Sequence, residues 1–90
     1  MKQIRWSDHA RQNLRDRDID PAEAEKTLID PEYIATGQQS RSIYMRRYQD
    51  QVLEQLMLLR LIVEDTATEM VVVTVYKTSQ ITKYLGEHLP

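Results

Sequence analysis

The spacing of hydrophobic residues changes once along this chain of 90 residues, from a helical period to a strand period. Trp6, Ala10 and Leu14 recur every four residues, which predicts one buried face of a helix over residues 7–17, with Ser7 as its N-cap. After residue 32 the hydrophobic residues alternate with polar ones, as they do in strands that bury one face. Helices followed by strands predict an α+β domain, with two N-terminal helices packed on one face of an antiparallel sheet.

The remaining elements are predicted from cap and turn signals. Asp20 and Pro21 suit the N-cap and the first position of a second helix, which Pro31 ends near Asp30. The alternating part predicts a meander of three or four antiparallel strands at residues 33–36, 41–48, 52–63 and 70–77, with a tight turn at residues 49–51. A short C-terminal helix over residues 78–85, with Gly86 as its C-cap, completes a single domain of residues 1–90.

Alternation also assigns side chains to the two faces of the sheet. One face would be wholly apolar and would pack against the helices: Met57, Leu59, Leu61, Val63, Val71, Val73 and Val75. The opposite face would mix aliphatic residues with arginines and tyrosines: Leu56, Leu58, Arg60, Ile62, Met70, Val72, Thr74 and Tyr76, with Tyr44, Arg46 and Tyr48 beside them. That face is too apolar to stay in water, so we expect the terminal helix, a second copy of the chain or another protein to cover it.

Composition excludes several classes of site. The chain has no cysteine, and its two histidines are too few for a histidine-built metal site, so we expect neither a metal nor a cofactor. Its first residues are polar and its apolar runs are short, which makes the cytoplasm the expected location, with no membrane partner. A net charge of −2 disfavours a general electrostatic grip on nucleic acid, although Arg41, Arg46 and Arg47 could form a local basic patch.

Two residues could each carry chemistry. His9 lies beside the apolar stripe of the first helix and could move protons near neutral pH, as cleavage of RNA through its 2′-hydroxyl requires. Alternatively, it makes one structural hydrogen bond at the helix edge. Arg60 stands among apolar neighbours in the longest strand and could hold a phosphate by two hydrogen bonds. Alternatively, it pairs with a carboxylate such as Glu54 or Glu69.

Polar residues of the strands suggest a surface for RNA. One set could stack the bases and contact the phosphates of a single strand: Tyr44, Arg46, Tyr48 and Tyr76. A second set could supply hydroxyl groups and an ammonium group to a developing phosphorane: Thr74, Tyr76 and Lys77. For both sets the alternative is an ordinary outer face of a sheet, because threonine and tyrosine are favoured strand residues.

Three stretches together resemble a known family. They are Ser7-Asp8-His9-Ala10-Arg11 running to Arg17-Asp18-Ile19, then Leu59-Arg60-Leu61-Ile62-Val63, and then Val73-Thr74-Val75-Tyr76-Lys77-Thr78-Ser79 followed by Lys83-Tyr84. In these stretches the chain resembles domain-of-unknown-function family 4258, a set of small bacterial domains similar to the RelE/ParE and BrnT toxins. The resemblance covers nearly the whole chain and implies a RelE-like fold.

The resemblance also implies an activity. A toxin of this kind would be an endoribonuclease that needs no metal, or would act on the ribosome, and an antitoxin would neutralise it. Carried over by position, His9 would be the general acid or base, Arg60 would hold phosphate, and Thr74 with Lys77 would line the site. The alternative is a non-catalytic module that keeps the toxin fold and binds a protein, or a second copy of itself, through the open face of the sheet.

Two residues depart from the pattern of the resembled family. Asn13 stands where arginine is common, which removes a cation from the neighbourhood of His9. Asp18 stands where glycine is common, at the end of the first helix. Aspartate tolerates the left-handed backbone conformation that such a glycine provides, so we expect this second change to cost little.

Overall fold

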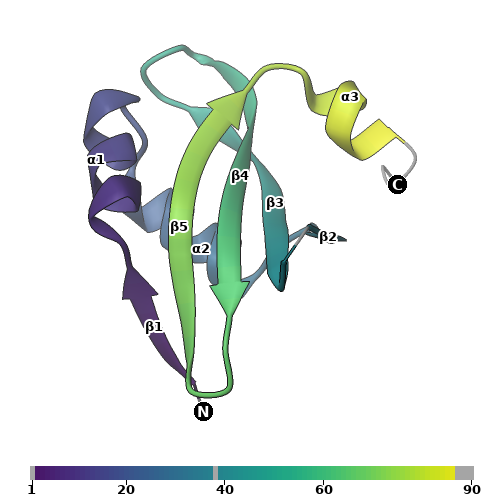
Figure 1. The fold of residues 1–90 in the computed structure, drawn as a ribbon. Coiled ribbons are helices and arrows are strands. Elements are labelled where there is room, and N and C mark those ends of the chain that lie inside the picture. Colours follow the sequence, from purple (N-terminus) through teal and green to yellow (C-terminus); the bar gives the residue numbers. More distant parts are fainter. Residues whose placement is uncertain (1, 38, 87–90) are drawn as a thin grey trace.

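The computed structural model describes residues 2–37 and 39–86, and this part of the chain forms an α+β fold with eight elements. In chain order they are β1 (Gln3–Trp6), α1 (Asp8–Asp16), α2 (Pro21–Ile29), β2 (Tyr33–Thr36), β3 (Arg41–Asp50), β4 (Gln55–Asp65), β5 (Glu69–Thr78) and α3 (Ile81–Leu85). The expected α+β class is confirmed (Figure 1). No helix in these two ranges combines the length and the apolar character that crossing a membrane requires.

The sheet differs from the predicted meander at one edge. Within the described ranges it has five strands in the order β1-β5-β4-β3-β2, and β1 runs parallel to β5 while the other neighbours are antiparallel. The expectation of three or four strands, all antiparallel, is therefore wrong. β1 has only four residues and a partner far along the chain, so its short alternation of Gln3, Ile4, Arg5 and Trp6 was too brief a signal to mark it as a strand.

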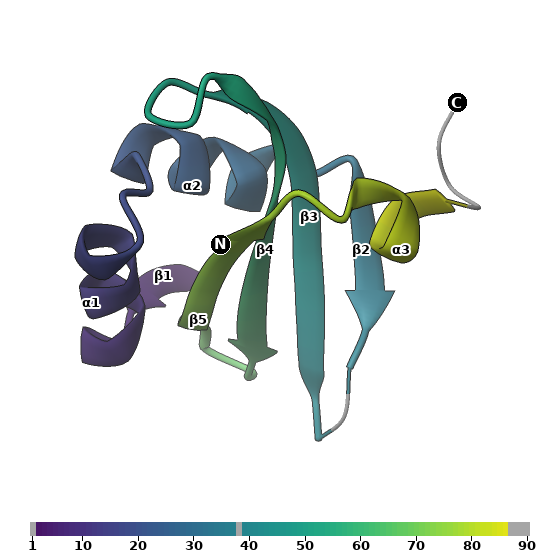
Figure 2. The same ribbon diagram turned by 90° about the horizontal axis from the view of Figure 1, so that it is seen from above.

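The helices cover both faces of the sheet (Figure 2). On one side α1 packs beside β5, and α2 packs across β3 and β4; we call this side the α1–α2 face. Its core contains Ala10, Ile19, Ala24, Leu28, Tyr48, Met57, Leu59, Leu61, Val63, Val72 and Val75. On the other side, the α3 face, Leu85 joins Met45 and Leu58 in a second buried cluster. Among the covers considered for this face, the terminal helix is the one that the structure shows.

Both N-terminal helices begin at the predicted caps. The Ser7 hydroxyl accepts a hydrogen bond from the Ala10 N–H, and an Asp20 carboxylate oxygen accepts one from the Ala22 N–H. α1 ends in a Schellman motif, in which the Ile19 N–H donates to the Leu14 carbonyl across 2.9 Å. Asp18 occupies the left-handed position with a φ of 52°, so the conformation expected at this site is confirmed.

Side chains of α1 and of its two caps form hydrogen bonds with the backbone of β5 along the part of its edge that β1 does not reach. β1 stops pairing where Trp6 lies opposite Val72, and beyond this point β5 has no neighbouring strand on that side within the described chain. Ser7 Oγ donates to the Val73 carbonyl, Arg17 Nη1 donates to the Val75 carbonyl, and Asn13 Oδ1 accepts from the Val75 N–H. An exposed strand edge would be open to pairing with other chains, so α1 protects it.

The connection between β3 and β4 is longer and lies later in the chain than predicted, and this difference moves the side chains of β3 to the opposite faces of the sheet. β3 continues to Asp50 and β4 begins at Gln55, which places the connection at residues 51–54 instead of 49–51. In the observed register Tyr44 lies opposite Leu61, and Arg46 lies opposite Leu59. Side chains that face each other across a ladder share a face, so Tyr44, Arg46 and Tyr48 lie on the α1–α2 face. Their expected place beside Arg60 is wrong.

A β-bulge changes the faces of β5 as well. Ile62 pairs with Thr74 but Val63 pairs with Val72, so Val73 is the extra residue. On the N-terminal side of this extra residue, Met70 and Val72 point toward the α1–α2 core, where Val71 and Val73 were expected. Ile62 and Thr74 keep their expected place on the α3 face.

Candidate functional site

Arg60 is a buried cation at the centre of the α3 face. It lies on β4 between Met45 of β3 and Tyr76 of β5, and only 9% of its surface is exposed. Its guanidinium carbon lies 3.8 Å from the ring centre of Tyr84 in α3 and 5.2 Å from that of Tyr76. Its Nε lies 3.4 Å from the sulfur of Met45. Two aromatic rings and a thioether therefore surround the charge, and cation–π attraction offsets part of its desolvation.

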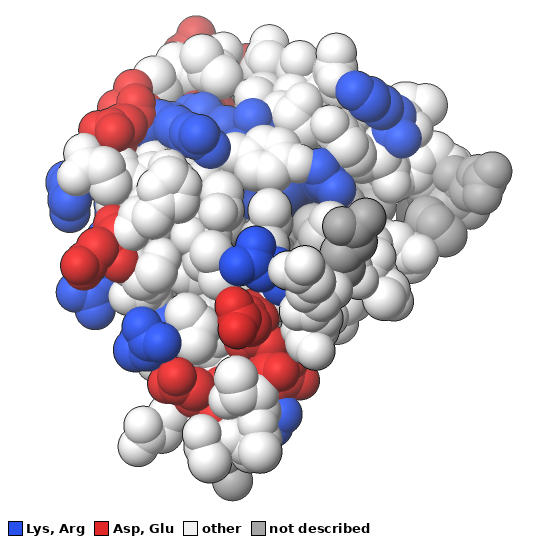
Figure 3. Space-filling model, in the orientation of Figure 1, with Lys and Arg blue, Asp and Glu red and all other residues white. Residues whose placement is uncertain are grey.

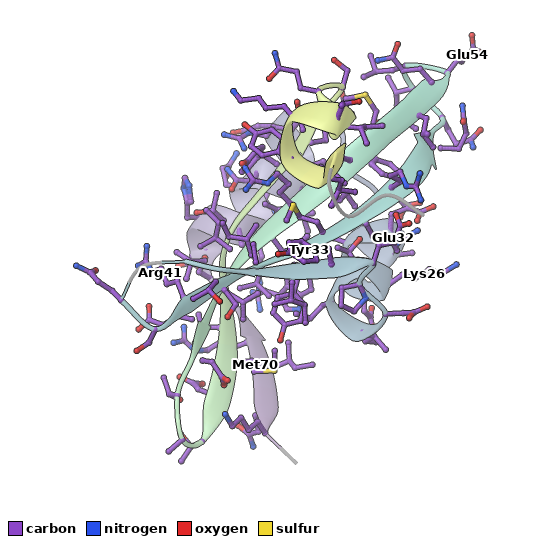
Figure 4. The ribbon with its side chains drawn as sticks, turned by 90° about the vertical axis from the view of Figure 1, so that its right-hand side faces the viewer. Lys26, Glu32, Tyr33, Arg41, Glu54 and Met70 are labelled. Atoms are coloured by element: carbon purple, nitrogen blue, oxygen red, sulfur yellow. The ribbon has the colours of Figure 1, made fainter. Side chains whose placement is uncertain are left out.

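No carboxylate within residues 2–37 and 39–86 forms an ion pair with Arg60. The two partners considered for it are placed elsewhere, so that expectation is wrong. Glu69 pairs with Arg5, and Glu54 lies at the tip of the β3–β4 hairpin (Figure 4). Buried cations are usually paired because desolvation of an isolated charge is costly. A buried guanidinium without a carboxylate partner favours binding of an anion, which supplies a negative charge and accepts hydrogen bonds from the guanidinium N–H groups.

A second cation lies close to the same ring. Lys83 Nζ is 5.3 Å from the ring centre of Tyr84, so two positive groups approach one tyrosine. Figure 3 shows basic and acidic side chains interspersed over this side of the molecule. The positive charge at this place is therefore local to Arg60 and Lys83, on a chain whose net charge is −2.

The four residues expected to act together are divided between three places. Arg60 and Thr74 share the α3 face, since Thr74 pairs with Ile62. Lys77 lies opposite Leu59 and points to the α1–α2 face. His9 is an exposed residue of α1. The structure brings Arg60, Thr74 and Tyr76 onto one surface, and the catalytic roles of His9 and Lys77 stay predictions.

The expected platform for RNA bases is also divided, because only Tyr76 lies on the α3 face. Tyr44 packs against the α1–α2 core, and Arg46 forms an ion pair with Glu23 of α2. Arg46 Nη2 donates a further hydrogen bond of 3.1 Å to the Glu23 carbonyl.

The three arginines that suggested a basic patch are separated and neutralised. Arg47 pairs with Glu32 across 2.6 Å, and Arg41 pairs with Glu64 across 3.6 Å. Figure 4 shows Arg41 and Glu32 far apart, at the two ends of the β2–β3 region. The hydrogen bonds from Arg47 lower the pKa of Glu32 despite the opposing effect of burial. With Arg46 held by Glu23, each of the three has an acidic partner.

Lys77 belongs to a buried polar network that sequence reasoning missed. Its Nζ lies 2.7 Å from Asp50 Oδ2, and the Tyr48 hydroxyl donates to the same oxygen across 2.7 Å. Asp50 Oδ1 accepts the N–H groups of Val52 and Leu53, both across 2.9 Å. The carboxylate is 2% exposed. Asp50 therefore links the β3–β4 connection to β5, because it binds both the backbone of the connection and Lys77 of β5. The available signal was an aspartate inside the predicted turn, two residues beyond the predicted strand end at residue 48.

The pKa values in this network follow from its contacts. Burial acts to raise the pKa of Asp50, but the hydrogen bonds from Lys77, the Leu53 N–H and Tyr48, with the charge of Lys77, outweigh burial and hold it well below its usual range. Burial and then the hydrogen bond to Asp50 raise the pKa of the Tyr48 hydroxyl above its usual range. At neutral pH Asp50 is thus charged and Tyr48 is neutral.

A cavity of about 480 Å³ lies beside this network, between the α1–α2 connection and the β3–β4 connection. Its apolar lining comes from Leu14, Ile19, Pro21, Tyr48 and Val52. The sequence gives one clue to this surface that we did not use, namely Val52, Leu53 and Leu56 gathered at a hairpin turn. Across the described ranges, no group of three or more histidine or acidic side chains is arranged to hold a metal ion.

Comparison with known proteins identifies a family and nothing finer. The model of the family described as "Domain of unknown function (DUF4258)" matches residues 6–77, four fifths of the chain. No curated protein and no solved structure matches the chain. The matched region runs from the end of β1 almost to the end of β5 and includes His9, Arg60 and Lys77. The chain therefore belongs to the DUF4258 family.

Proposed function

We propose that this protein is a toxin-like RNA-binding ribonuclease that needs no metal, and that RNA binds on the α3 face with a phosphate at Arg60. The observation that carries the proposal is the state of Arg60, which is 9% exposed and lacks a carboxylate partner in the described chain. A buried cation whose described contacts are two rings and a thioether, with no carboxylate among them, favours a role in binding an anion.

RNA offers both a negatively charged phosphate for Arg60 and flat bases for the tyrosine rings beside it. A phosphodiester presents two oxygens to the fork of a guanidinium, and Arg60 can bind it in this bidentate way. The rings of Tyr76 and Tyr84 lie beside the guanidinium and offer surfaces on which unpaired bases stack. Lys83 adds a positive charge near Tyr84. A single strand fits this arrangement better than a duplex, because stacking on tyrosine requires unpaired bases.

Cleavage would proceed by attack of the RNA 2′-hydroxyl on the adjacent phosphorus. A base removes the proton of that hydroxyl, the bond to the 5′-oxygen breaks, and an acid returns a proton to the leaving oxygen. Arg60 would stabilise the charge that develops on the phosphorane oxygens, and Thr74 on the same face could donate a hydrogen bond. His9 is kept as the candidate acid or base, and its contribution is measured separately.

The test compares cleavage of RNA by matched arginine variants. Purified protein is incubated in EDTA with total RNA and, separately, with translating ribosomes. Arg60→Met keeps the length of the side chain and removes its charge, while Arg41→Gln removes an exposed, paired arginine of β3 as the control. We expect cleavage by the wild type and by Arg41→Gln, and its loss in Arg60→Met. A folded wild-type protein that neither binds nor cleaves RNA in either setting would overturn the proposal.

His9→Ala tests whether His9 is the general acid or base of the cleavage step. His9 is exposed, so this substitution should leave the fold intact. Loss of cleavage with retained binding of a fluorescent single-stranded RNA would identify His9 as a catalytic residue. Unchanged cleavage would remove His9 from the mechanism and leave proton transfer to groups on the α3 face.

A further inference from the structure

We propose that the cavity beside the β3–β4 connection, together with the apolar side chains at that hairpin end, binds an apolar and basic segment of another protein. The cavity lies on the α1–α2 face, on the other side of the sheet from Arg60, and the apolar surface continues from it around the hairpin end to Leu56, which alternation places on the α3 side. The proposal therefore goes beyond the RNA-binding function and does not depend on it.

The cavity has the size and lining of a binding pocket. Its volume of about 480 Å³ falls within the range of roughly 300–1,000 Å³ that is typical of ligand sites. Leu14 comes from the last part of α1, Ile19 from the α1–α2 connection, Pro21 from the start of α2, and Val52 from the hairpin. Figures 1 and 2 both show the β3–β4 connection reaching over toward the α1–α2 connection.

Both walls of the cavity are held in place. The Schellman motif that ends α1 positions Leu14 and Ile19. The two hydrogen bonds that Asp50 accepts from the backbone of Val52 and Leu53 hold the hairpin end. The pocket is therefore preorganised, which lowers the entropy cost of binding a partner.

Apolar surface continues outside the cavity. Val52 is 65% exposed, Leu56 is 50% exposed and Leu53 is 48% exposed. These are three of the six large hydrophobic residues that are exposed in the described ranges, and all three lie at one hairpin end. A small molecule in the cavity would leave Leu53 and Leu56 in water, whereas a protein segment laid across the hairpin would cover them as well. The exposed residues therefore favour a protein partner.

The charge at the rim indicates the character of that partner. Asp18 and Asp20 line the cavity, and neither carboxylate has an ion-pair partner among the described residues. Arg15 is the one cation among the lining residues. An excess of negative charge would repel the phosphates of RNA and attract lysine or arginine. The expected segment places an apolar side chain in the cavity and basic side chains opposite Asp18 and Asp20.

The experiment uses a displayed library of random peptides, selected on the immobilised full chain. Enriched peptides are then synthesised, and their dissociation constants are measured with the wild type and with three variants. Leu53→Asp places a charge on the apolar surface, and Asp18→Gly removes one rim carboxylate at a position whose φ of 52° suits glycine. Ile4→Asp is the matched control, because Ile4 on β1 is also 48% exposed but lies outside this surface.

We expect the enriched peptides to combine an apolar residue with lysine or arginine. Their affinity should fall at least about tenfold with Leu53→Asp, should fall with Asp18→Gly and with added salt, and should not change with Ile4→Asp. Failure to enrich any peptide, enrichment of acidic peptides, or an equal loss with Ile4→Asp would each overturn the proposal. Circular dichroism of every variant confirms that a loss of binding is not a loss of fold.

Discussion

Replacing Asp50 by alanine would remove the acceptor of four hydrogen bonds in a single substitution. Lys77 Nζ and the Tyr48 hydroxyl each lie 2.7 Å from Oδ2, and two backbone N–H groups lie 2.9 Å from Oδ1. The Lys77 side chain is 12% exposed and that of Asp50 is 2% exposed, so the variant would leave a mostly buried ammonium group without its counter-charge.

The expected cost follows from these contacts. A hydrogen bond to a charged group contributes about 1.5–3 kcal/mol, so a simple sum would reach about 6–12 kcal/mol. That sum is too large, because water entering the space left by the carboxylate can solvate Lys77 and the freed N–H groups. Breaking one partner of a buried ion pair typically costs about 3–5 kcal/mol, and this is the loss we expect in the free energy of unfolding.

Urea denaturation followed by circular dichroism measures this loss. The matched control is Asp65→Ala, which breaks an ion pair of nearly the same length, 2.6 Å from Lys2. The Lys2 and Asp65 side chains are 40% and 49% exposed, so this control should lose less than about 1 kcal/mol. The double variant Asp50→Ala with Lys77→Met should lose less than the sum of the two single variants. If Asp50→Ala costs no more than Asp65→Ala, burial does not strengthen this pair and the reasoning is refuted.

Three further predictions concern the stability of the fold. The free energy of unfolding should stay level between pH 7 and about pH 5 and fall below about pH 4. The pKa of Asp50 is lower in the folded chain than in the unfolded chain, so as the pH falls the unfolded chain binds a proton at this carboxylate before the folded chain does. Urea titrations at each pH should show a shallower fall for Asp50→Asn. Asp18→Gly should raise the free energy of unfolding by about 0.5–1 kcal/mol, since it removes a left-handed aspartate, and an unchanged or lower value would contradict the assigned conformation. Asn13→Ala should cost about 1–3 kcal/mol by leaving the Val75 N–H unpaired, while exposed Gln12→Ala serves as its neighbour control.

Local signals in the sequence predicted the helices well. Ser7 and Asp20 cap their helices as expected, because a cap depends on residues that are three or fewer positions apart. The left-handed Asp18 was expected from the resemblance, because glycine is common at this position in the resembled family. The edge strand β1 was missed because its pairing with β5 depends on residues far along the chain.

The faces of the strands were harder to predict because alternation has a period of two. A hairpin connection assigned to residues 49–51 instead of 51–54 changes which residues lie opposite each other, and this moved Tyr44, Arg46 and Tyr48 to the wrong face. The bulge at Val73 had the same effect on Met70 and Val72. Nothing in a run of three valines marks which one is unpaired, so the sequence alone could not locate the bulge.

These errors decided how much of the site could be predicted. Arg60, Thr74 and Tyr76 were assigned to one surface, and the structure places them there. Lys77 was grouped with them although it lies on the other face, and its partner Asp50 was not considered. That Arg60 pairs with neither Glu54 nor Glu69 could not be read from the sequence, because both are near it along the chain while the fold places Glu69 beside Arg5 and Glu54 at the hairpin tip.

The parallel strand β1 has a consequence for the order in which the molecule assembles during its synthesis. The Ser7 hydroxyl and the Val73 carbonyl that it contacts are 66 positions apart, so β1 leaves the ribosome long before its partner β5 has been made. Closing so long a loop costs entropy that is regained only after β5 has docked on β4. We expect β1 and α1 to join the sheet last, and chains interrupted before β5 is made to expose an open edge of β4 that pairs with strands of other molecules.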